Sequence, residues 1–351
     1  MDRLRVAIAG CHRMLDTANR GHNWANGFAR VRDTSVVAVF DRDLKTRERF
    51  RSVWRDTWGD IPGYGDYDRM LAETSPDIVC ITTRQTMHAD QIEAAVAAEV
   101  RGIACEKPLA TSLEETDRIV SACKEGKVAL ALLLDRRWFA SYSAVRKLLR
   151  DGAIGDVTSV VAFGVPNLIN HGCHWYDAAL ALAGDAEPLW TSGHVDDVGG
   201  DDPNSTRRLD PPGRSWTQLD NGVRISTMPE GLPRLSFTVS GTDGNLSTFE
   251  VGDFEFEEVV AYYTLNDSRG QRTRVELPDE EEEWLAGRAA VQDLVDAVNS
   301  GRATACDIEE ARRATEIGFA IHASHRTGGA LVTYPIADRS HRIESLPWGN
   351  E

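Results

Sequence analysis

The chain has 351 residues, 42% of them hydrophobic and 27% charged, a composition typical of a globular protein long enough for two domains. Its 39 lysines and arginines against 55 acidic residues give a formal net charge of −16. This charge argues against a nucleic acid or an anionic membrane surface as partner, because the field of the protein would repel both. No apolar run is long enough to span a bilayer and no export signal is visible, so we expect a cytoplasmic protein.

The cysteines are far apart in the sequence, and none forms a Cys-x-x-Cys pair. Most have apolar neighbours, as in IVCITT and GIACEKP. This pattern indicates reduced, buried thiols rather than a metal site or disulfides. The residues concerned are Cys11, Cys80, Cys105, Cys123, Cys173 and Cys306.

Residues 1–128 alternate between strand and helix patterns. Short apolar runs rich in β-branched residues predict strands at RVAIAG, SVVAVFD, DIVCITT, RGIACEK and KVALALLL. Amphipathic stretches between them predict helices at NWANGFARV, YDRMLAET, HADQIEAAVAAEV and SLEETDRIVSACKEG. Apolar strands separated by helices of this length form a parallel sheet that is covered on both faces. We therefore expect an α/β fold here, a Rossmann dinucleotide-binding domain over residues 1–128.

Residues 129–351 have a different pattern, which predicts an α+β domain with a large, mostly antiparallel sheet. Alternating strands such as GVRISTMP, RLSFTVSG and NLSTFEV are joined by turns rich in Gly, Asp and Pro. Residues 199–215 are polar and turn-rich, which predicts a mobile loop. The acidic run Glu280–Glu283 fits the start of a long helix, where the helix dipole favours negative charge.

The first motif that carries chemistry joins RVAIAGCHRM to SVVAVFDRD. In a Rossmann unit a glycine loop brings backbone N–H groups close to a pyrophosphate, and an acid at the end of the second strand binds the adenosine ribose. Gly10 and Asp41 occupy these two places. Their separation of about thirty residues exceeds the usual ~20, which an extended loop over Cys11–Gly21 explains. A parallel-sheet domain with a glycine in its first turn and no cofactor would show the same motif.

The second motif is CEKPLATSLEE. Lys107 follows a buried predicted strand and precedes Pro108, so it projects from the carboxyl end of the sheet, where open α/β sheets bind ligands. Glu106 and Pro108 constrain its direction. A lysine held there can hydrogen-bond a substrate hydroxyl and support proton transfer beside a cofactor. The alternative is a surface lysine at a turn.

The third motif is NHGCHWYDAALALAG. Asn170, His174 and Asp177 lie at positions i, i+4 and i+7, which places them on one face of a predicted helix. Histidine titrates near neutrality and suits a proton relay. Taken alone, the same three residues are also typical of a capping and structural cluster.

These motifs occur in a fixed order with others: TTRQTMH, EKPLA, LLDRRW, LLRDGAIGDV, HWYDAALALAG and GTDGNL. In this order the chain resembles the glucose–fructose oxidoreductase / inositol dehydrogenase / rhizopine catabolism (Gfo/Idh/MocA) family, from about residue 4 to residue 335. The resemblance implies an NAD(P)-dependent oxidoreductase that transfers a hydride between the nicotinamide and a secondary alcohol or ketone of a sugar, cyclitol or sugar derivative. It also implies a homodimer or homotetramer packed through the open sheet face of the second domain.

The resemblance assigns roles to residues of the substrate site. Lys107 matches the catalytic lysine of the family and His174 its proton-relay histidine, whereas Asn170 stands where many relatives carry an aspartate. An amide can orient a hydroxyl but cannot accept a proton as a carboxylate does, so the relay would run through Lys107 and His174 alone. His171 and Trp175 are further substrate-binding candidates, with a capping role for His171 and a core role for Trp175 as alternatives.

The resemblance also implies a set of cofactor-binding residues. Thr82 and Thr83 keep the family pattern after the third strand, while Arg84 replaces the usual proline. His88 matches a helix-start histidine for which a structural role is favoured, and Arg137 falls where the family often places an arginine near the substrate or the cofactor carboxamide, with a structural ion pair as the alternative. The full set is Gly10, His12, Arg13, Asp41, Arg42, Thr82, Thr83, His88, Glu106, Lys107 and Arg137.

The phosphate loop departs most from the family pattern Gly-x-Gly-x-x-Gly, because His12 stands in place of the second glycine. A Cβ there tends to push the phosphates outward. Side chains of the added residues offer other phosphate contacts, and we expect cofactor binding by a remodelled loop. The candidates are Arg13, Arg20, His22 and Asn23.

Asp41 favours NAD as cofactor, because a carboxylate suits two ribose hydroxyls and repels a 2′-phosphate. Arg42 beside it keeps NADP open. No metal site is expected.

Two other functions fit the same residues. Redox-assisted elimination or glycoside cleavage would use the same cofactor, with transient oxidation acidifying a neighbouring C–H. A non-catalytic family member that binds a nucleotide or a sugar, as a sensor or partner subunit, fits the departures at His12, Arg84 and Asn170. That interpretation gives no chemical reason to keep Lys107 and His174 together.

Overall fold

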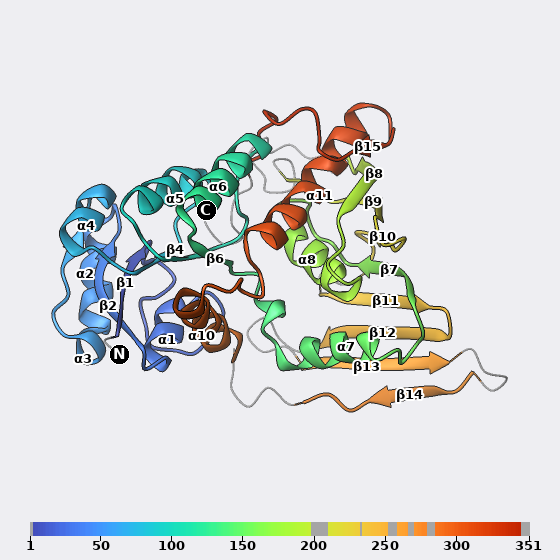
Figure 1. The fold of residues 1–351 in the computed structure, drawn as a ribbon, viewed down its shortest axis with the longest axis horizontal. Coiled ribbons are helices and arrows are strands. Elements are labelled where there is room, and N and C mark those ends of the chain that lie inside the picture. Colours follow the sequence, from blue (N-terminus) through green and yellow to red (C-terminus); the bar gives the residue numbers. More distant parts are fainter. Residues whose placement is uncertain are drawn as a thin grey trace. The chain divides into compact units, whose positions relative to one another are not determined.

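The chain folds into two compact units (Figure 1). The computed structural model describes residues 3–197, 210–231, 234–251, 258–265, 270–278 and 285–344. The described residues of unit 1 fall within 1–110, 115–138 and 281–309, and those of unit 2 within 111–114, 139–280 and 310–351. The expected loop over 199–215 lies outside the described residues up to residue 209, and so does the acidic run Glu280–Glu283.

Unit 1 is built on a parallel sheet, in which the described residues form six strands in the order β3-β2-β1-β4-β5-β6. Every residue of β4 and β5 is buried, because helices cover both faces. In the centre, Ile8 pairs with Val39 on one side and with Cys80 on the other. The expected Rossmann sheet is confirmed. The strands are β1 (Leu4–Ala9), β2 (Thr34–Phe40), β3 (Gly63–Tyr64), β4 (Ile78–Ile81), β5 (Gly102–Cys105) and β6 (Ala129–Leu132).

Helix α10 (Leu285–Ser300) packs in unit 1 against α1, β5 and β6, although it follows the second sheet in the sequence (Figure 1). Glycines allow this close packing: a Cβ on Gly27 would lie 2.9 Å from the Gly287 carbonyl oxygen, and a Cβ on Gly102 would lie 2.6 Å from Val298. Compared with the predicted domain 1–128, unit 1 also contains this helix and the segment up to Trp138, and it lacks residues 111–114, which belong to unit 2. The other helices between its strands are α1 (Trp24–Arg30), α2 (Leu44–Val53), α3 (Arg55–Trp58), α4 (Tyr67–Thr74), α5 (His88–Ala97) and α6 (Leu113–Gly126).

Unit 2 contains a sheet of nine strands among the described residues, in the order β14-β13-β12-β11-β7-β10-β9-β8-β15. All neighbours are antiparallel except β7 and β10, so the predicted mostly antiparallel sheet is confirmed. Burial alternates along β9, with Ser215 and Thr217 buried and Arg214 and Trp216 exposed, as expected for a sheet covered on one face. The strands are β7 (Val157–Phe163), β8 (Pro188–Val195), β9 (Gly213–Leu219), β10 (Arg224–Thr227), β11 (Ser236–Gly241), β12 (Gly244–Val251), β13 (Glu258–Leu265), β14 (Arg272–Val275) and β15 (Val332–Thr333).

Three helices pack on this sheet or on each other: α7 (Ala140–Arg150), α8 (Gly172–Leu182) and α11 (Ile308–Arg326). Helix α8 lies against β7 and β10, and α7 contacts α8 and β13. Helix α11 approaches β8 so closely that a Cβ on Gly193 would lie 2.9 Å from Ile321.

All six cysteines are buried, and none of them forms a disulfide. Burial raises the pKa of the Cys80 and Cys105 thiols well above the ordinary range, which keeps them protonated and unreactive. None of the described helices is both long enough and apolar enough to cross a membrane. Among the described residues, no three His, Cys, Asp or Glu side chains are arranged to hold a metal ion.

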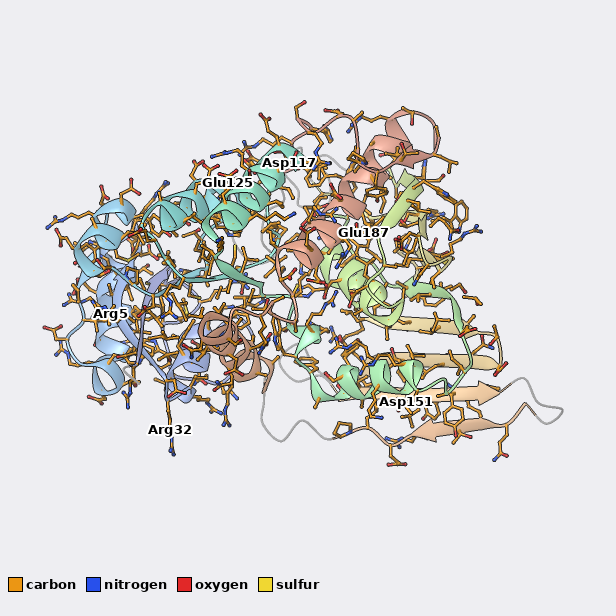
Figure 2. All side chains as sticks on the ribbon, in the orientation of Figure 1. Arg5, Arg32, Asp117, Glu125, Asp151 and Glu187 are labelled. Atoms are coloured by element: carbon orange, nitrogen blue, oxygen red, sulfur yellow. The ribbon has the colours of Figure 1, made fainter. Side chains whose placement is uncertain are left out.

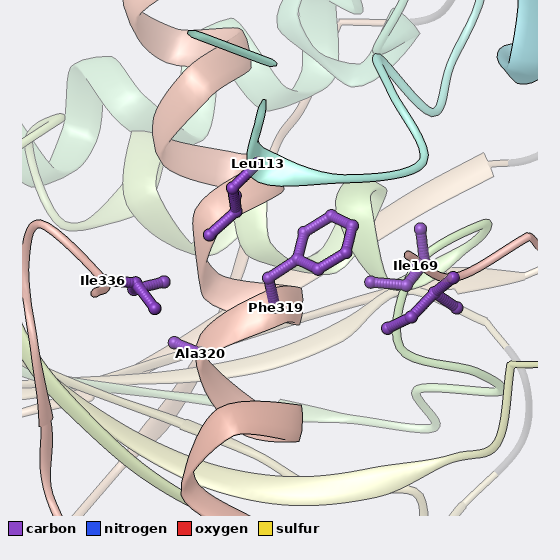
Figure 3. Packing of buried hydrophobic residues seen from close by; sticks show 6 residues of the cluster. Leu113, Ile169, Phe319, Ala320 and Ile336 are labelled. Carbon is purple, nitrogen blue, oxygen red and sulfur yellow. The ribbon is translucent and has the colours of Figure 1, made fainter. Parts of the chain in front are cut away.

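A hydrophobic cluster in unit 2 anchors residues that flank two of the motifs (Figure 3). Leu113 follows Lys107 by six residues, and Ile169 precedes His174 by five. Both pack in the cluster that surrounds Phe319 of α11, which is 2% exposed. The chain segments beside the two motifs are therefore held by one apolar core. Its members are Leu113, Ile169, Phe319, Ala320, Ile336 and Ile343.

Replacing Phe319 should destabilise unit 2 strongly. We expect Phe319→Ala to lower the free energy of unfolding by about 3–5 kcal/mol, because it leaves a cavity where a fully buried ring packed. Chemical denaturation measures this, with Leu331→Ala as control, since Leu331 is 61% exposed. Similar small losses in both variants would show that the cluster contributes little.

Candidate active site

Gly10, the residue directly after strand β1, allows the carboxyl ends of β1 and β4 to approach each other closely. Gly10 has φ +90°, and a Cβ on it would lie 2.7 Å from the Thr82 carbonyl oxygen. The Thr82 hydroxyl in turn donates to the Gly10 carbonyl at 2.6 Å and to the Ala9 carbonyl at 3.0 Å. Only glycine combines this backbone conformation with this close approach. The carboxyl ends of β1 and β4 therefore meet at the edge where open α/β sheets bind ligands.

The extended loop after Gly10 is held by its own side chains. The buried Asn23 amide donates to the carbonyl of Ala18 at 2.8 Å and to that of Asp16 at 3.1 Å. Arg20 forms an ion pair with Asp16 at 2.7 Å. Arg20 and Asn23, two of the predicted phosphate contacts, are thus engaged in shaping the loop.

His12 and Arg13 are exposed at the first turn of this loop, which a hydrogen bond from Met14 N to the Cys11 carbonyl closes at 3.0 Å. Within the part of the chain that the structure describes, neither side chain forms a hydrogen bond or an ion pair. The backbone at His12 is outside the left-handed region, so a residue other than glycine adopts it without strain. The loop therefore presents a guanidinium and an imidazole that are available to phosphate oxygens.

Asp41 joins the end of β2 to the phosphate loop. Its Oδ2 accepts the Cys11 N–H at 2.8 Å, and its Oδ1 accepts the Asp43 N–H at 3.0 Å. Each carboxylate oxygen has a second lone pair, so both can still accept a ribose hydroxyl. Next to it, Arg42 is exposed and its side chain bonds to none of the described residues.

The loop after β4 keeps its shape although Arg84 replaces the family's proline. Arg84 has φ −72°, which is the value that proline would impose. The Thr83 hydroxyl donates to Gln91 Oε1 at 2.5 Å. His88 is fully buried, with its ring nitrogens 3.1 Å from the Pro108 carbonyl and 3.2 Å from the Thr83 carbonyl. Burial lowers the pKa of His88, and its place favours the structural role over cofactor contact.

Lys107 stands beside a buried carboxylate that several groups share. Glu106 is 8% exposed; its Oε1 accepts the Trp24 indole N–H at 2.6 Å and lies 2.8 Å from His22 Nδ1. Its Oε2 accepts the Lys107 backbone N–H at 3.1 Å. His22 adopts φ +66°, a strained conformation for a residue other than glycine, and its bond to Glu106 compensates for that strain. The end of the extended loop and the backbone of Lys107 are therefore fixed by one side chain.

The environment of Glu106 favours its ionised form. Burial alone would raise its pKa, but the His22 ring in its protonated form, the hydrogen bond from that ring, the charge of Lys107 and the Trp24 N–H outweigh burial. Together they lower the pKa of Glu106 from 4.5 to about 2. The carboxylate is thus ionised at neutral pH and serves as a hydrogen-bond acceptor, not as an acid.

In unit 2, the polar residues of the third motif lie at the start of α8. Asn170, His174 and Asp177 are 4%, 8% and 1% exposed. Asn170 belongs to the turn that precedes the helix, because α8 begins at Gly172, so the predicted single helical face is wrong for Asn170. Lys107 lies in unit 1 and these residues lie in unit 2.

His171 and Trp175, which flank His174 in the sequence, make hydrogen bonds within the fold. The Asn167 side chain accepts the His171 N–H at 2.7 Å and contacts His171 Nδ1 at 3.1 Å, so Asn167 caps this turn and the His171 ring lies against it. Trp175 is 3% exposed and its indole N–H donates to the Phe163 carbonyl at 2.7 Å, which favours the core role for this ring. Arg137 is 5% exposed within the short 3-10 helix Asp135–Arg137 of unit 1, and its contact with a cofactor stays a prediction.

Sequence reasoning missed two residues of these sites. Trp24 is part of the predicted helix NWANGFARV and was given no role at the site, although its indole N–H binds Glu106. Asp210 was taken as part of a loop, although its buried carboxylate accepts the backbone N–H groups of residues 168–170. The turn in which Asn170 lies could have indicated that some acceptor was needed, but not which residue supplies it.

Glu106→Gln should destabilise unit 1 in a pH-dependent way. Because folding lowers the pKa of Glu106, the carboxylate stabilises the folded state above pH 4.5, and this contribution disappears as the pH falls toward 2. At pH 7 we expect a loss on the order of 3 kcal/mol, which should shrink below pH ~4.5. Urea unfolding of both proteins across pH measures the difference.

The matched control is Glu125→Gln, because Glu125 projects from α6 on the surface of the same unit (Figure 2). That variant should differ little from the wild type at any pH. A Glu106→Gln loss that is equally large at pH 3 and pH 7 would contradict the proposed role of the charge.

Comparison with known proteins agrees with the fold. Residues 4–133 match the family described as an oxidoreductase family with an NAD-binding Rossmann fold. An oxidoreductase from Agrobacterium radiobacter, solved in complex with NAD+, L-tartaric acid and magnesium, aligns with a TM-score of 0.75 and 18% identity, over 94% of this chain and 98% of that chain. At this identity the likeness shows a common fold.

Two relatives are dehydrogenases of sugars. The D-apiose dehydrogenase of Rhizobium rhizogenes is 32% identical over 156 residues, which cover 44% of this chain and 42% of that protein. The D-xylose 1-dehydrogenase (NADP(+)) 2 of Haloferax volcanii is 25% identical over 338 residues, or 91% of this chain and 98% of that protein. The chain spans about half or less of the length of the D-apiose dehydrogenases that it matches. By its fold, its ordered motifs and these matches, the chain is similar to the Gfo/Idh/MocA oxidoreductases, and residues 4–133 match the model of that family.

Proposed function

We propose that the protein is an NAD(P)-dependent oxidoreductase. It transfers a hydride between the nicotinamide and a secondary alcohol or ketone of a sugar, cyclitol or other polyol-like substrate. The observation that carries this proposal is Lys107 at the carboxyl edge of the parallel sheet, with its backbone N–H bound by the buried carboxylate of Glu106. The D-apiose and D-xylose dehydrogenase relatives support the substrate class.

The residues of unit 1 fit a dinucleotide. Gly10 lets the carboxyl ends of β1 and β4 approach closely at the edge of the sheet, and Asp41 keeps acceptor capacity for ribose hydroxyls. The exposed Arg13 and His12 are suited to the pyrophosphate. We infer NAD as the first cofactor because of Asp41, with NADP as the second because the exposed Arg42 can meet a 2′-phosphate. The bound nicotinamide would supply the hydride acceptor or donor.

Residues of the chain itself would transfer the proton of the substrate hydroxyl. The Lys107 ammonium donates a hydrogen bond to the substrate oxygen and stabilises the negative charge that develops there. The His174 ring takes up or returns the hydroxyl proton, and the Asn170 amide orients the hydroxyl without exchanging a proton. This role assignment requires that Lys107 and His174 reach the same substrate.

The non-catalytic alternative loses much of its support. Arg84 has the φ of the proline it replaces, and His12 and Arg13 are exposed side chains that can bind phosphate oxygens in place of the backbone of the missing glycine. Of the three departures from the family pattern, only Asn170 changes a group that could take part in proton transfer. Redox-assisted elimination has no feature of its own in its favour.

Cofactor binding followed by a Lys107 variant tests the proposed function. Nicotinamide fluorescence should report binding of NADH, of NADPH or of both, and a screen of aldoses, ketoses and cyclitols should find turnover. Lys107→Ala should then lower kcat on the order of 10²–10⁴-fold, because it removes the donor to the reacting oxygen, with little change in cofactor affinity. Lys124→Ala is the control, since Lys124 is an exposed lysine of the same unit.

Failure to bind either nucleotide would contradict the enzyme assignment. Normal turnover of Lys107→Ala would remove Lys107 from the reaction while leaving the cofactor site intact.

We also propose that the protein is cytoplasmic, because its six cysteines are buried and form no disulfide.

We further propose that unit 2 pairs with a second copy of the chain through the exposed face of its sheet. This face carries Trp216, which is 56% exposed, and Arg224, whose guanidinium lies 5.7 Å from the centre of the Trp190 ring. Exposed aromatic and arginine side chains of this kind are enriched in interfaces.

Sedimentation should therefore find a dimer or tetramer, and Trp216→Glu should shift it toward the monomer. A wild type that stays monomeric at micromolar concentration would contradict the pairing.

A further inference from the structure

A carboxylate in unit 2 binds three consecutive backbone N–H groups just before the helix that carries His174. Asp210 is 0% exposed. Its Oδ1 accepts the N–H of Leu168 at 3.0 Å and of Ile169 at 2.8 Å, and its Oδ2 accepts that of Asn170 at 2.7 Å. We propose that Asp210 is a positioning residue of the reaction, which holds this turn so that Asn170 and His174 keep their orientation. The inference rests on the proposed function.

The chemistry of the turn explains why a carboxylate is needed. Successive N–H groups that point into one concavity make a positive site that binds an anion. Hydrogen bonds to a charged acceptor are stronger than those to a neutral one. Because Asp210 is fully buried, its removal would take the carboxylate acceptor from the N–H groups of Ile169 and Asn170 in a place that water does not reach easily, while the Leu168 N–H would keep the Pro211 carbonyl at 3.1 Å.

The same turn is held on its other side by α11. The Ile169 side chain packs in the cluster around Phe319 (Figure 3). Gly318 of α11 lies so close that a Cβ on it would be 2.7 Å from the Leu168 carbonyl oxygen and 2.9 Å from Ile169 Cδ1. The turn is therefore held between a carboxylate and a helix, and a change on either side should move it.

A displacement of the turn would be transmitted to His174 through a few hydrogen bonds. The turn runs directly into α8, where the His174 N–H donates to the His171 carbonyl at 2.9 Å. The His171 N–H is bound in turn by Asn167 Oδ1 at 2.7 Å. Reactions that depend on oriented groups lose on the order of 10²-fold for a misplacement of about 1 Å. Asp210 therefore acts on the rate through Asn170 and His174 and touches neither substrate nor cofactor.

Asp210→Asn is the direct test, because an amide keeps the size of the side chain but offers one oxygen where the turn needs two. We expect kcat to fall about 10- to 100-fold for the folded protein, with an unchanged dissociation constant for NADH or NADPH. Hydrogen exchange of peptides covering residues 166–172 should accelerate. A loss of global stability alone would leave kcat per folded molecule unchanged. It would also not accelerate exchange at residues 166–172 selectively.

Tyr142→Phe is the matched control. It removes a buried hydrogen bond of unit 2 between α7 and β12, from the Tyr142 hydroxyl to Glu250 Oε1 at 3.0 Å, and leaves Asp210 and its hydrogen bonds in place. It should lower the unfolding midpoint while kcat and exchange at 166–172 stay as in the wild type.

Gly318→Ala is the second variant, which leaves Asp210 in place and pushes on the Leu168 carbonyl. If Asp210→Asn does not fold, this variant decides: a lower kcat with unchanged cofactor affinity supports the inference, and an unchanged kcat overturns it. A folded Asp210→Asn with wild-type kcat also overturns it. If the wild type binds cofactor but turns over no substrate, the proposed function fails and this inference fails with it. If the wild type turns over and only the variants are unaffected, the inference alone fails.

Discussion

The buried carboxylate of Glu106 determines how the remodelled phosphate loop and the proposed catalytic lysine fit on one sheet edge. It receives the Trp24 indole and the His22 imidazole from the end of the loop, and the N–H of Lys107 from its own strand end. An ionised group this deeply buried is stable only while its donors remain, so none of the three can move independently. The extension of the loop is tolerated because its far end is fixed at Glu106 and its near end at Asp41, which binds Cys11 N.

The reaction itself would depend on a second buried carboxylate, that of Asp210. Each of the two acids stands next to a segment that carries a proposed functional residue, and neither is assigned a chemical step. Glu106 fixes the backbone of Lys107, and Asp210 fixes the turn that contains Asn170. In both units, the precision of the functional group would thus come from hydrogen bonds to backbone N–H groups rather than from the functional side chain.

The sequence predicted the sheets well because their signals are local. Buried parallel strands read as continuous apolar runs, and a sheet covered on one face alternates, as β9 does. The placement of α10 was not predictable, because its amphipathic pattern does not say which sheet it covers. The prediction that Asn170 lies in the helix was wrong for a related reason. A spacing of four residues fits a helix, but Asn170 lies in a turn that is held by a carboxylate forty residues later. Every residue except proline has a backbone N–H group, so the sequence does not show which of these groups bind Asp210.

The departures from the family pattern proved less disruptive than the residue types suggest. Arg84 keeps the φ of the proline that it replaces. His12 adopts an ordinary backbone conformation, but its Cβ stands where the family glycine lets the backbone approach the pyrophosphate. What changes at His12 and Arg13 is the chemistry available to phosphate, which shifts from backbone to side-chain donors.

The most direct test of the account is the fate of the hydride. Reduced cofactor with deuterium at both C4 positions of the nicotinamide should be incubated with the ketone that the substrate screen identifies, in ordinary water. The account predicts that the alcohol product carries one deuterium on the reduced carbon, in amounts equal to the cofactor oxidised. A product without deuterium would contradict it, because the new hydrogen would then have come from water.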